Sequence, residues 1–435
     1  MSVPRPGANP ATARWLIVAL LTGLVFLAHF NRVSISVAAN AHFIGPEKLS
    51  EQQMGLVYSA FLFVYTLGML PGGYALDRVG PRRALTAMGV GLGFWAALTG
   101  VLGWSGLSIP AMLFPLLAVR GLAGATSVPL HPGAARAVSL WVPVRDRSTA
   151  NGLVTAGALV GIALTYPVFG RLMDRVGWQS AFVVCGATLG LFALVWHALA
   201  ADAPAEHRRA VSASAGAPAA LRAYVTLREA VGLLRNRSLV LLTLSYGALG
   251  YVQYMFFYWI EYYFSKELKL PESESRRAAF IVTLAMAGGM VLGGWVSDRL
   301  CRAVGLNWGC RAMAVAGMVL SAGFSLLGVA TTDPQEVTWW FALALGSLGM
   351  CEGIFWTTAP ALAPRTGGLA CALVNTGGNG VGMLAPVVTP LLGQHYGWAT
   401  AVAVACGICA AGGLLWFGIT PAADDSHRSG ADMGR

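Results

Sequence analysis

The stretch GYALDRVGPRR, at residues 73–83, is a short basic segment between two long apolar runs. A degenerate copy, GWVSDR at residues 294–299, follows another apolar run in the second half of the chain. Each copy has a glycine, three further residues and then Asp-Arg. The residues that define the two copies are Gly73, Asp77, Arg78, Gly80, Arg82, Arg83, Asp298 and Arg299. A loop repeated at matching places predicts that the chain consists of two related halves.

The composition indicates an integral membrane protein. Hydrophobic residues make up 56% of the 435 residues, and charged residues only 11%. Soluble domains carry roughly 25% charged residues, so a soluble fold of this composition could not cover its surface. The 54 glycines fall inside apolar runs rather than in linkers. Small residues in such runs allow membrane helices to approach closely.

The apolar runs divide into six, a polar break and six. A spanning helix needs about 20 apolar residues, and runs of this kind predict all-α architecture with twelve transmembrane helices in two pseudo-symmetric six-helix bundles. The predicted spans are 15–38, 52–76, 84–104, 110–139, 148–170, 179–200, 238–262, 276–297, 312–331, 338–361, 367–393 and 398–418. We expect a first bundle at 1–200, a linker at 201–237, a second bundle at 238–420 and a tail at 421–435.

The net charge of +10 is concentrated in alternate short loops, at 78–83, 136–147, 299–311 and in the linker. The remaining loops are acidic or mixed. Cytoplasmic loops of membrane proteins carry an excess of Lys and Arg. We therefore expect the basic loops and both termini on the cytoplasmic side of the plasma (inner) membrane, and no nucleic-acid partner.

The segment 73–83 resembles the signature G-x3-D-R-x-G-x-R-R of the major facilitator superfamily, which lies between helices two and three. In that loop Asp77 is suited to hold neighbouring helices together through a helix N-terminus and nearby arginines. Finer features resemble the anion:cation symporter branch, which includes bacterial sugar-acid transporters and animal sialin and vesicular glutamate carriers. These features are FNRVSISVA at 30–38, YTLGMLPGG at 65–73, RGLAGATSVPLHP at 120–132 and the Gly/Asn pattern at 367–386. The resemblance covers most of the chain outside the linker and the tails.

Two departures from this family pattern bear on mechanism. The family has an aspartate in helix one and a glutamate in helix four, which take up and release protons in proton-coupled relatives. Here these places hold Asn31 and Ser127, and neither side chain titrates usefully. The resemblance therefore implies anion recognition without establishing proton coupling.

Arg32 and Arg120 lie within predicted spans, and no acid is near them in sequence. A charge at the membrane centre costs roughly 2.5–3.5 kcal/mol or more, so it needs a partner or a substrate. A guanidinium binds a carboxylate through two hydrogen bonds and does not lose its proton. Two such groups predict an anionic substrate. The alternative for each is a structural arginine bonded to backbone carbonyls or reaching a helix end.

Other polar residues in the spans are candidates for binding or coupling. Glu352 is the clearest second-half acid, suited equally to coupling and to a structural role, while Glu261 is expected at the outer rim. His131 and His29 are first-half titratable candidates, although a lone buried histidine is more often structural. The remaining candidates for a substrate-binding wall are Asn31, Tyr65, Tyr251, Tyr254, Tyr258, Asn375 and Asn379.

These features predict a secondary carrier for a small organic anion, a sugar acid or another carboxylate, with binding between the halves. We expect a monomer without cofactor or metal, and a co-transported proton or sodium ion remains open. A uniporter, an exchanger or a carrier of a drug or metal chelate is the alternative, and a transport-like sensor is a third. The chain lacks a Walker loop, HExxH and Cys/His metal spacing, so we expect neither an ATP-driven pump nor an enzyme.

Overall fold

The computed structural model describes residues 10–143, 146–201, 232–363 and 366–420, and these residues form helices joined by short connections. The predicted linker at 201–237 and the tail at 421–435 lie largely outside the described residues. The first half contains α1 (Pro10–Ala38), α2 (Glu51–Val79), α3 (Pro81–Leu102), α4 (Leu113–Ser127), α5 (Leu130–Trp141), α6 (Arg147–Leu164) and α7 (Gly170–Leu199). The second half contains α10 (Arg237–Tyr262), α11 (Glu272–Val304), α12 (Leu306–Ala330), α13 (Pro334–Leu362), α14 (Gly367–Gly382), α15 (Ala385–Tyr396) and α16 (Trp398–Leu414).

Nine stretches of the described residues are long and apolar enough to cross a membrane, and the helix order confirms the predicted all-α fold class of two six-helix halves. Pairs such as α4–α5 and α14–α15 each make one crossing, and α7 is divided at Gly177, where φ is 79°. Short π-helical segments extend three crossings: η1 (Ala39–Phe43), η4 (Thr165–Phe169) and η5 (Tyr263–Glu267). The helix α11 begins at Glu272 and ends at Val304, beyond the predicted 276–297, because the helix continues through charged residues at both ends of its apolar run.

Four glycine turns show the internal repeat. Gly80 separates α2 from α3 with φ 83°, and Gly305 separates α11 from α12 with φ 85°. Gly177 and Gly397 occupy the matching places before the last crossing of each half, with φ 79° and 85°. Residues that carry a side chain rarely adopt a backbone conformation with φ in this positive range, so glycine is required there. The same backbone recurs at the same point of each half.

The signature loop carries a helix cap that also repeats. Arg82 donates from Nε and Nη2 to the carbonyl oxygen of His197, at 2.9 and 2.6 Å, in the last turn of α7. Arg311 donates at 3.0 Å to the carbonyl oxygens of Trp416 and of Ile419, at the end of the chain's last described helix. Cations at helix C-termini satisfy otherwise unpaired carbonyls and favour the helix dipole. The side chain of Asp77 lies outside the described residues.

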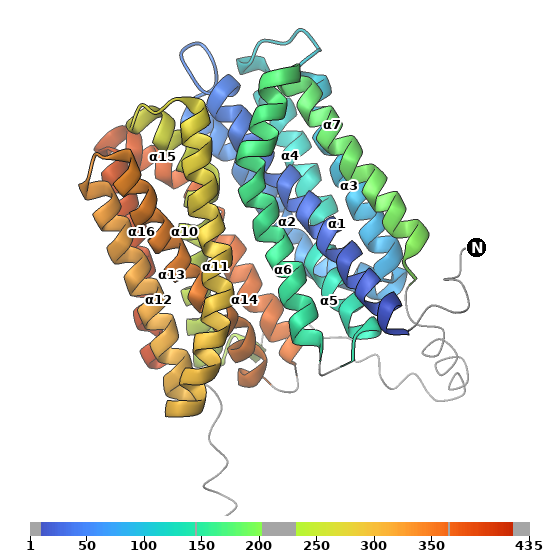
Figure 1. Ribbon diagram of the computed structural model, residues 1–435, viewed down its shortest axis with the longest axis vertical. Coiled ribbons are helices and arrows are strands. Elements are labelled where there is room, and N and C mark those ends of the chain that lie inside the picture. Colours follow the sequence, from blue (N-terminus) through green and yellow to red (C-terminus); the bar gives the residue numbers. More distant parts are fainter. Residues whose placement is uncertain (1–9, 144–145, 202–231, 364–365, 421–435) are drawn as a thin grey trace, which may run out of the picture.

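Figure 1 shows the two halves side by side, with α1–α7 in blue to green and α10–α16 in yellow to red. Across the boundary α2 contacts α14 and α15, α6 contacts α11, and α1 contacts α10. Large apolar side chains such as Phe94, Phe114 and Leu191 are exposed on the outside of the bundles. An exposed apolar surface of this extent fits contact with lipid.

Candidate functional site

A cavity of about 2150 Å³ lies between the halves, lined by residues of both. It opens at the end of the molecule that carries the basic loops, where exposed Arg78, Arg136 and Asp298 line its mouth. The predicted binding residues that line this cavity are Arg32, Tyr65, Tyr254, Tyr258, Asn375 and Asn379. Both coupling candidates, Glu352 and His131, line it as well.

Arg32 projects from α1 into a cluster of aromatic rings. Its guanidinium carbon lies 4.8 Å from the ring centroid of Phe61, 5.7 Å from that of Tyr65 and 5.2 Å from that of Tyr254. Its Nη2 donates a hydrogen bond of 2.8 Å to the hydroxyl of Tyr254 on α10. Ring faces attract cations without neutralising them. The buried guanidinium is therefore stabilised in place while retaining donors for an anion.

Tyr254 connects this cation to the amides of α14. Its hydroxyl donates to Oδ1 of Asn379 at 2.7 Å, and Nδ2 of Asn379 donates to Oδ1 of Asn375 at 3.0 Å. The two asparagines are one helical turn apart, which places both amides on one face as predicted. The helices approach so closely that a Cβ at Gly250 of α10 would lie 2.3 Å from the carbonyl oxygen of Gly378. This close crossing brings the tyrosine and the amides together.

Glu352 lies in the second-half wall of the same cavity and is 7% exposed. Its Oε1 accepts hydrogen bonds from the Tyr246 hydroxyl at 2.5 Å and from the Trp356 indole at 3.3 Å. Its Oε2 is buried and has no hydrogen-bond partner among the described residues. The second-half wall of the cavity therefore includes an acid with one buried oxygen that has no partner among the described residues.

His131 and His29 lie beside Arg32, with their ring centroids 5.2 Å apart. They also line a small side cavity of about 10 Å³ together with Arg32 and Ser127. Ser127 donates to the carbonyl oxygen of Ala123 at 2.7 Å, so its hydroxyl is used within its own helix. Histidine is the side chain suited to proton exchange near neutral pH, and among the described first-half residues that line the cavity the histidines are His29 and His131.

Asn31 and Arg120, both predicted to bind substrate, lie outside the walls of this cavity. Asn31 faces α7, and its Nδ2 donates to the carbonyl oxygens of Leu27 at 2.9 Å and Cys185 at 3.4 Å. Arg120 lies 5.0 Å from the centroid of the Phe61 ring, which Arg32 also contacts, and donates at 2.9 Å to the carbonyl oxygen of Arg32. The structure thus gives Asn31 a helix-packing contact and Arg120 a contact that holds the backbone of Arg32.

The end opposite the cavity mouth is closed by contacts between α2 and the second half. The rings of Tyr58 and Tyr258 stack with centroids 4.7 Å apart, and the Tyr262 hydroxyl donates to Glu51 at 2.5 Å. A Cβ at Gly55 would lie 2.1 Å from the carbonyl oxygen of Pro386 in α15. We call this set of contacts the outer closure.

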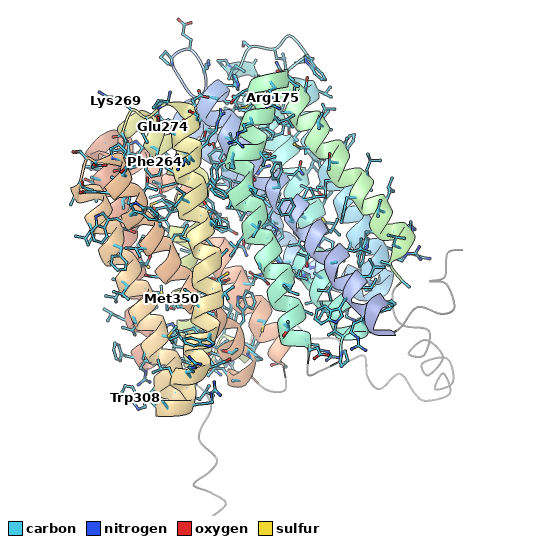
Figure 2. The ribbon with its side chains drawn as sticks, in the orientation of Figure 1. Arg175, Phe264, Lys269, Glu274, Trp308 and Met350 are labelled. Atoms are coloured by element: carbon cyan, nitrogen blue, oxygen red, sulfur yellow. The ribbon has the colours of Figure 1, made fainter. Side chains whose placement is uncertain are left out.

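An ion cluster seals the outer closure from the side of α11. Arg276 pairs with Asp174 of α7 at 2.5 Å and with Glu261 of α10 at 3.3 Å, and also with Glu272 at 2.8 Å. Asn40 of the first half donates to Glu261 at 3.5 Å. Glu261 is therefore buried inside the cluster rather than exposed at a rim. Figure 2 places Arg175 and Glu274, close in sequence to this cluster, at one end of the molecule and Trp308 at the other.

Sequence reasoning missed Arg276, Asp174 and Tyr246. Arg276 sits at the polar start of its helix, where it resembles an ordinary interfacial arginine. Tyr246 has a usable signal, because it lies eight residues before Tyr254 and so on the same face of α10. Tyr251, which the sequence predicts in the wall, is not among the lining residues.

The family model described as "Major Facilitator Superfamily" matches residues 21–366 and 303–433. The chain is 27% identical over 432 residues to the D-galactonate transporter of Escherichia coli, covering 96% of this chain and 97% of that protein. It is 27% identical over 409 residues to a probable galactarate/D-glucarate transporter of Bacillus subtilis, covering 89% and 86%. It is also 27% identical over 397 residues to a probable sulfoacetate transporter of Cupriavidus necator, covering 88% of each.

Two solved structures share the fold. A bacterial homologue of the human lysosomal transporter Spinster, in an inward-facing and occupied conformation, matches with a TM-score of 0.75 at 16% identity, covering 94% of this chain and 97% of that one. A D-xylose-proton symporter matches with a TM-score of 0.70 at 16% identity, covering 95% and 98%. The family match, the repeated signature loop and the two six-helix halves lead to one conclusion. The chain belongs to the major facilitator superfamily.

Proposed function

We propose that this protein is a secondary carrier of a small organic anion and that the anion binds to Arg32 in the cavity between the halves. The observation that carries the proposal is the buried guanidinium of Arg32, which lines the cavity and has one hydrogen-bonding side-chain partner, Tyr254, among the described residues. A buried cation of this kind needs compensation. A substrate carboxylate supplies the missing charge.

The names of the similar proteins support the same substrate class. They are transporters named for D-galactonate, for galactarate and D-glucarate, and for sulfoacetate, all of which are organic anions. The uncharged part of the proposed site suits a hydroxylated acid, because Tyr254, Asn375 and Asn379 offer hydroxyl and amide groups to the cavity. We infer that a sugar acid places its carboxylate on Arg32 and its hydroxyls on these groups.

The proposed transport cycle is alternating access, in which the two halves rock about the central site. The cavity mouth at the basic end, together with the outer closure at the opposite end, corresponds to an inward-open carrier if the basic loops are cytoplasmic. In the other state the outer closure separates, and Arg276 loses Asp174 while it keeps Glu261 and Glu272 within its own half. Both termini lie on the cytoplasmic side in this proposal.

Coupling to an ion involves Glu352 or His131 in this proposal. Glu352 lines the cavity and has a buried oxygen without a partner among the described residues, and His131 lies beside Arg32 in the opposite wall. Each can carry a proton, and Glu352 can alternatively hold a sodium ion with Tyr246. Exchange or uniport without coupling is the second candidate, and it is favoured by Asn31 and Ser127, which replace the two carboxylates of proton-coupled relatives.

Uptake into proteoliposomes tests the proposal. The purified full-length protein is reconstituted, and a panel of radiolabelled organic acids is offered with and without an imposed pH or sodium gradient. We expect saturable uptake of at least one carboxylate and its loss in Arg32→Gln. Uptake of neutral sugars or cationic drugs with no uptake of any acid would overturn anion transport. Acid uptake that ignores every gradient would establish the uncoupled alternative.

A further inference from the structure

The buried charged groups that line the cavity form two separate poles. Arg32 is the buried cation at its closed end, with His29 and His131 on the same side. Glu352 is the buried acid of the second-half wall. Between them the second half presents uncharged Asn375 and Asn379. No Lys, Arg or His of the described second-half residues lines the cavity.

The separation of the two poles follows from α10. The hydroxyl of Tyr254 accepts a hydrogen bond of 2.8 Å from Arg32, and the hydroxyl of Tyr246 donates one of 2.5 Å to Glu352. These tyrosines are eight residues apart on one helix face, which separates them by about 12 Å along the axis. Tyr246 is nearer the cavity mouth, because α10 begins at the basic end. Glu352 thus lies between Arg32 and the mouth.

A substrate bound to Arg32 extends towards Glu352. The stacked rings of Tyr58 and Tyr258 close the opposite direction. A six-carbon acid contains five carbon–carbon bonds of about 1.5 Å each. When its carboxylate is on Arg32, its other end therefore spans more than half of the distance from Arg32 to Glu352. The next cations are Arg78 and Arg136, which are exposed at the mouth. Water and salt screen charges at such positions.

We propose that this site accepts hydroxylated acids with a single carboxylate and that Glu352 excludes acids with a second carboxylate at the far end. This inference rests on the proposed carrier function and deepens it. A far hydroxyl brings no charge towards Glu352, which lines the cavity, whereas a far carboxylate meets a like charge. When Glu352 is protonated, the far carboxylate still finds no cation in the second-half wall. A buried charge without a partner is costly in either case.

Similarity alone leaves this choice open. The proteins named for galactonate, with one carboxylate, and for galactarate and glucarate, with two, are each 27% identical to this chain. The charge arrangement of the cavity distinguishes the two classes where overall identity does not.

The test compares matched pairs of acids that differ only in the far group. The purified protein in detergent is titrated calorimetrically at neutral pH with D-galactonate and galactarate, and with threonate and tartrate. Like charges within several ångströms repel strongly at the dielectric effective in proteins, so we expect at least about tenfold tighter binding of the monoacid in a pair. In Glu352→Gln we expect diacid affinity to rise and the ratio to fall below about threefold. Glu336→Gln is the matched control, because Glu336 is an exposed acid on the same helix, outside the cavity.

Equal or tighter binding of the diacids by the wild-type protein would overturn the inference and leave the proposed function standing. A monoacid preference that persists unchanged in Glu352→Gln would overturn the role of Glu352. If no acid of either pair binds, the inference fails together with the proposed sugar-acid site.

Discussion

Replacing Gly55 by alanine should weaken the outer closure and shift the protein towards the state in which, in the proposed cycle, that end is open. Gly55 lies on α2, where it contacts the backbone of α15 across the boundary between the halves. An added Cβ would lie 2.1 Å from the carbonyl oxygen of Pro386 and 3.2 Å from Cα of Val387. The obstacle is backbone, so no side-chain rotation can relieve it.

The magnitude follows from this overlap. Real Cβ atoms essentially never approach a heavy atom within 3.0 Å, so α2 and α15 must separate by about 1 Å. Overpacking a well-packed contact costs about 1–3 kcal/mol. The cost applies only when the outer end is closed, because in the proposed cycle these helices move apart in the other state. A change of this size shifts a two-state population by about 5- to 150-fold.

Pulsed electron paramagnetic resonance measures the shift directly. Nitroxide labels at Lys48 and Lys269, both exposed at the outer end and in different halves, report whether that end is closed. We expect a short-distance population in the parent protein and a longer one in Gly55→Ala, together with slower transport. Gly288→Ala is the control, because a Cβ there meets nothing within 4 Å. Both changes remove a helical glycine, so their gains in helix propensity of about 1 kcal/mol cancel.

An unchanged distance distribution in Gly55→Ala would refute the reasoning, because the overlap would then be absorbed without opening. Equal shifts in both variants would also refute it, since the effect would then come from helix propensity. A lowered melting temperature with unchanged distances would assign Gly55 to folding rather than to the cycle.

Three further predictions concern the cavity and the outer closure. Arg32→Lys should weaken anion binding at least about tenfold, because a lysine cannot form the two-pronged contact with a carboxylate, and calorimetric titration that gives wild-type affinity would contradict this. Asp174→Asn removes the ion pair of Arg276 with the opposite half, so we expect electron paramagnetic resonance to show a longer distance between the two labels at the outer end. Glu272→Gln changes an exposed acid of Arg276's own half and should leave that distance unchanged. Equal effects of the two substitutions would show that the loss of one negative charge matters and the contact between the halves does not. Glu352→Gln should abolish accumulation driven by a pH gradient and retain substrate exchange in proteoliposomes, and persistent gradient-driven accumulation would exclude Glu352 as the coupling group.

Several features of the fold were readable in the sequence because they depend on local patterns. Apolar runs long enough to cross a membrane predict the helices, since every backbone polar group in lipid must be paired within its own segment. The repeated Gly-x3-Asp-Arg loop predicts two related halves, and Gly80 and Gly305 then adopt the same backbone. The sequence predicts the ends of the helices less accurately, because α11 and α12 continue through polar residues beyond their apolar runs.

Part of the candidate site was also readable. Arg32 stood out because charge within an apolar run is expensive, and Asn375 and Asn379 because their spacing places them on one helix face. Each of these inferences depends on the residues of a single helix and on no contact between helices. The structure places all three in the cavity wall.

Only the tertiary structure decided which helix faces meet. The rotation of α1 directs Asn31 towards α7 and Arg32 into the cavity, although the two are adjacent in sequence. Arg276 forms an ion pair between the halves only because the fold brings it to Asp174, which is 102 residues away in the sequence. Periodicity determines which residues share a face, but close packing between distant helices determines what that face contacts. The sequence by itself therefore predicts a membrane carrier of two halves with a buried cation. The packing of the helices determines where Arg32 and Glu352 lie in the cavity and which end of the cavity is closed.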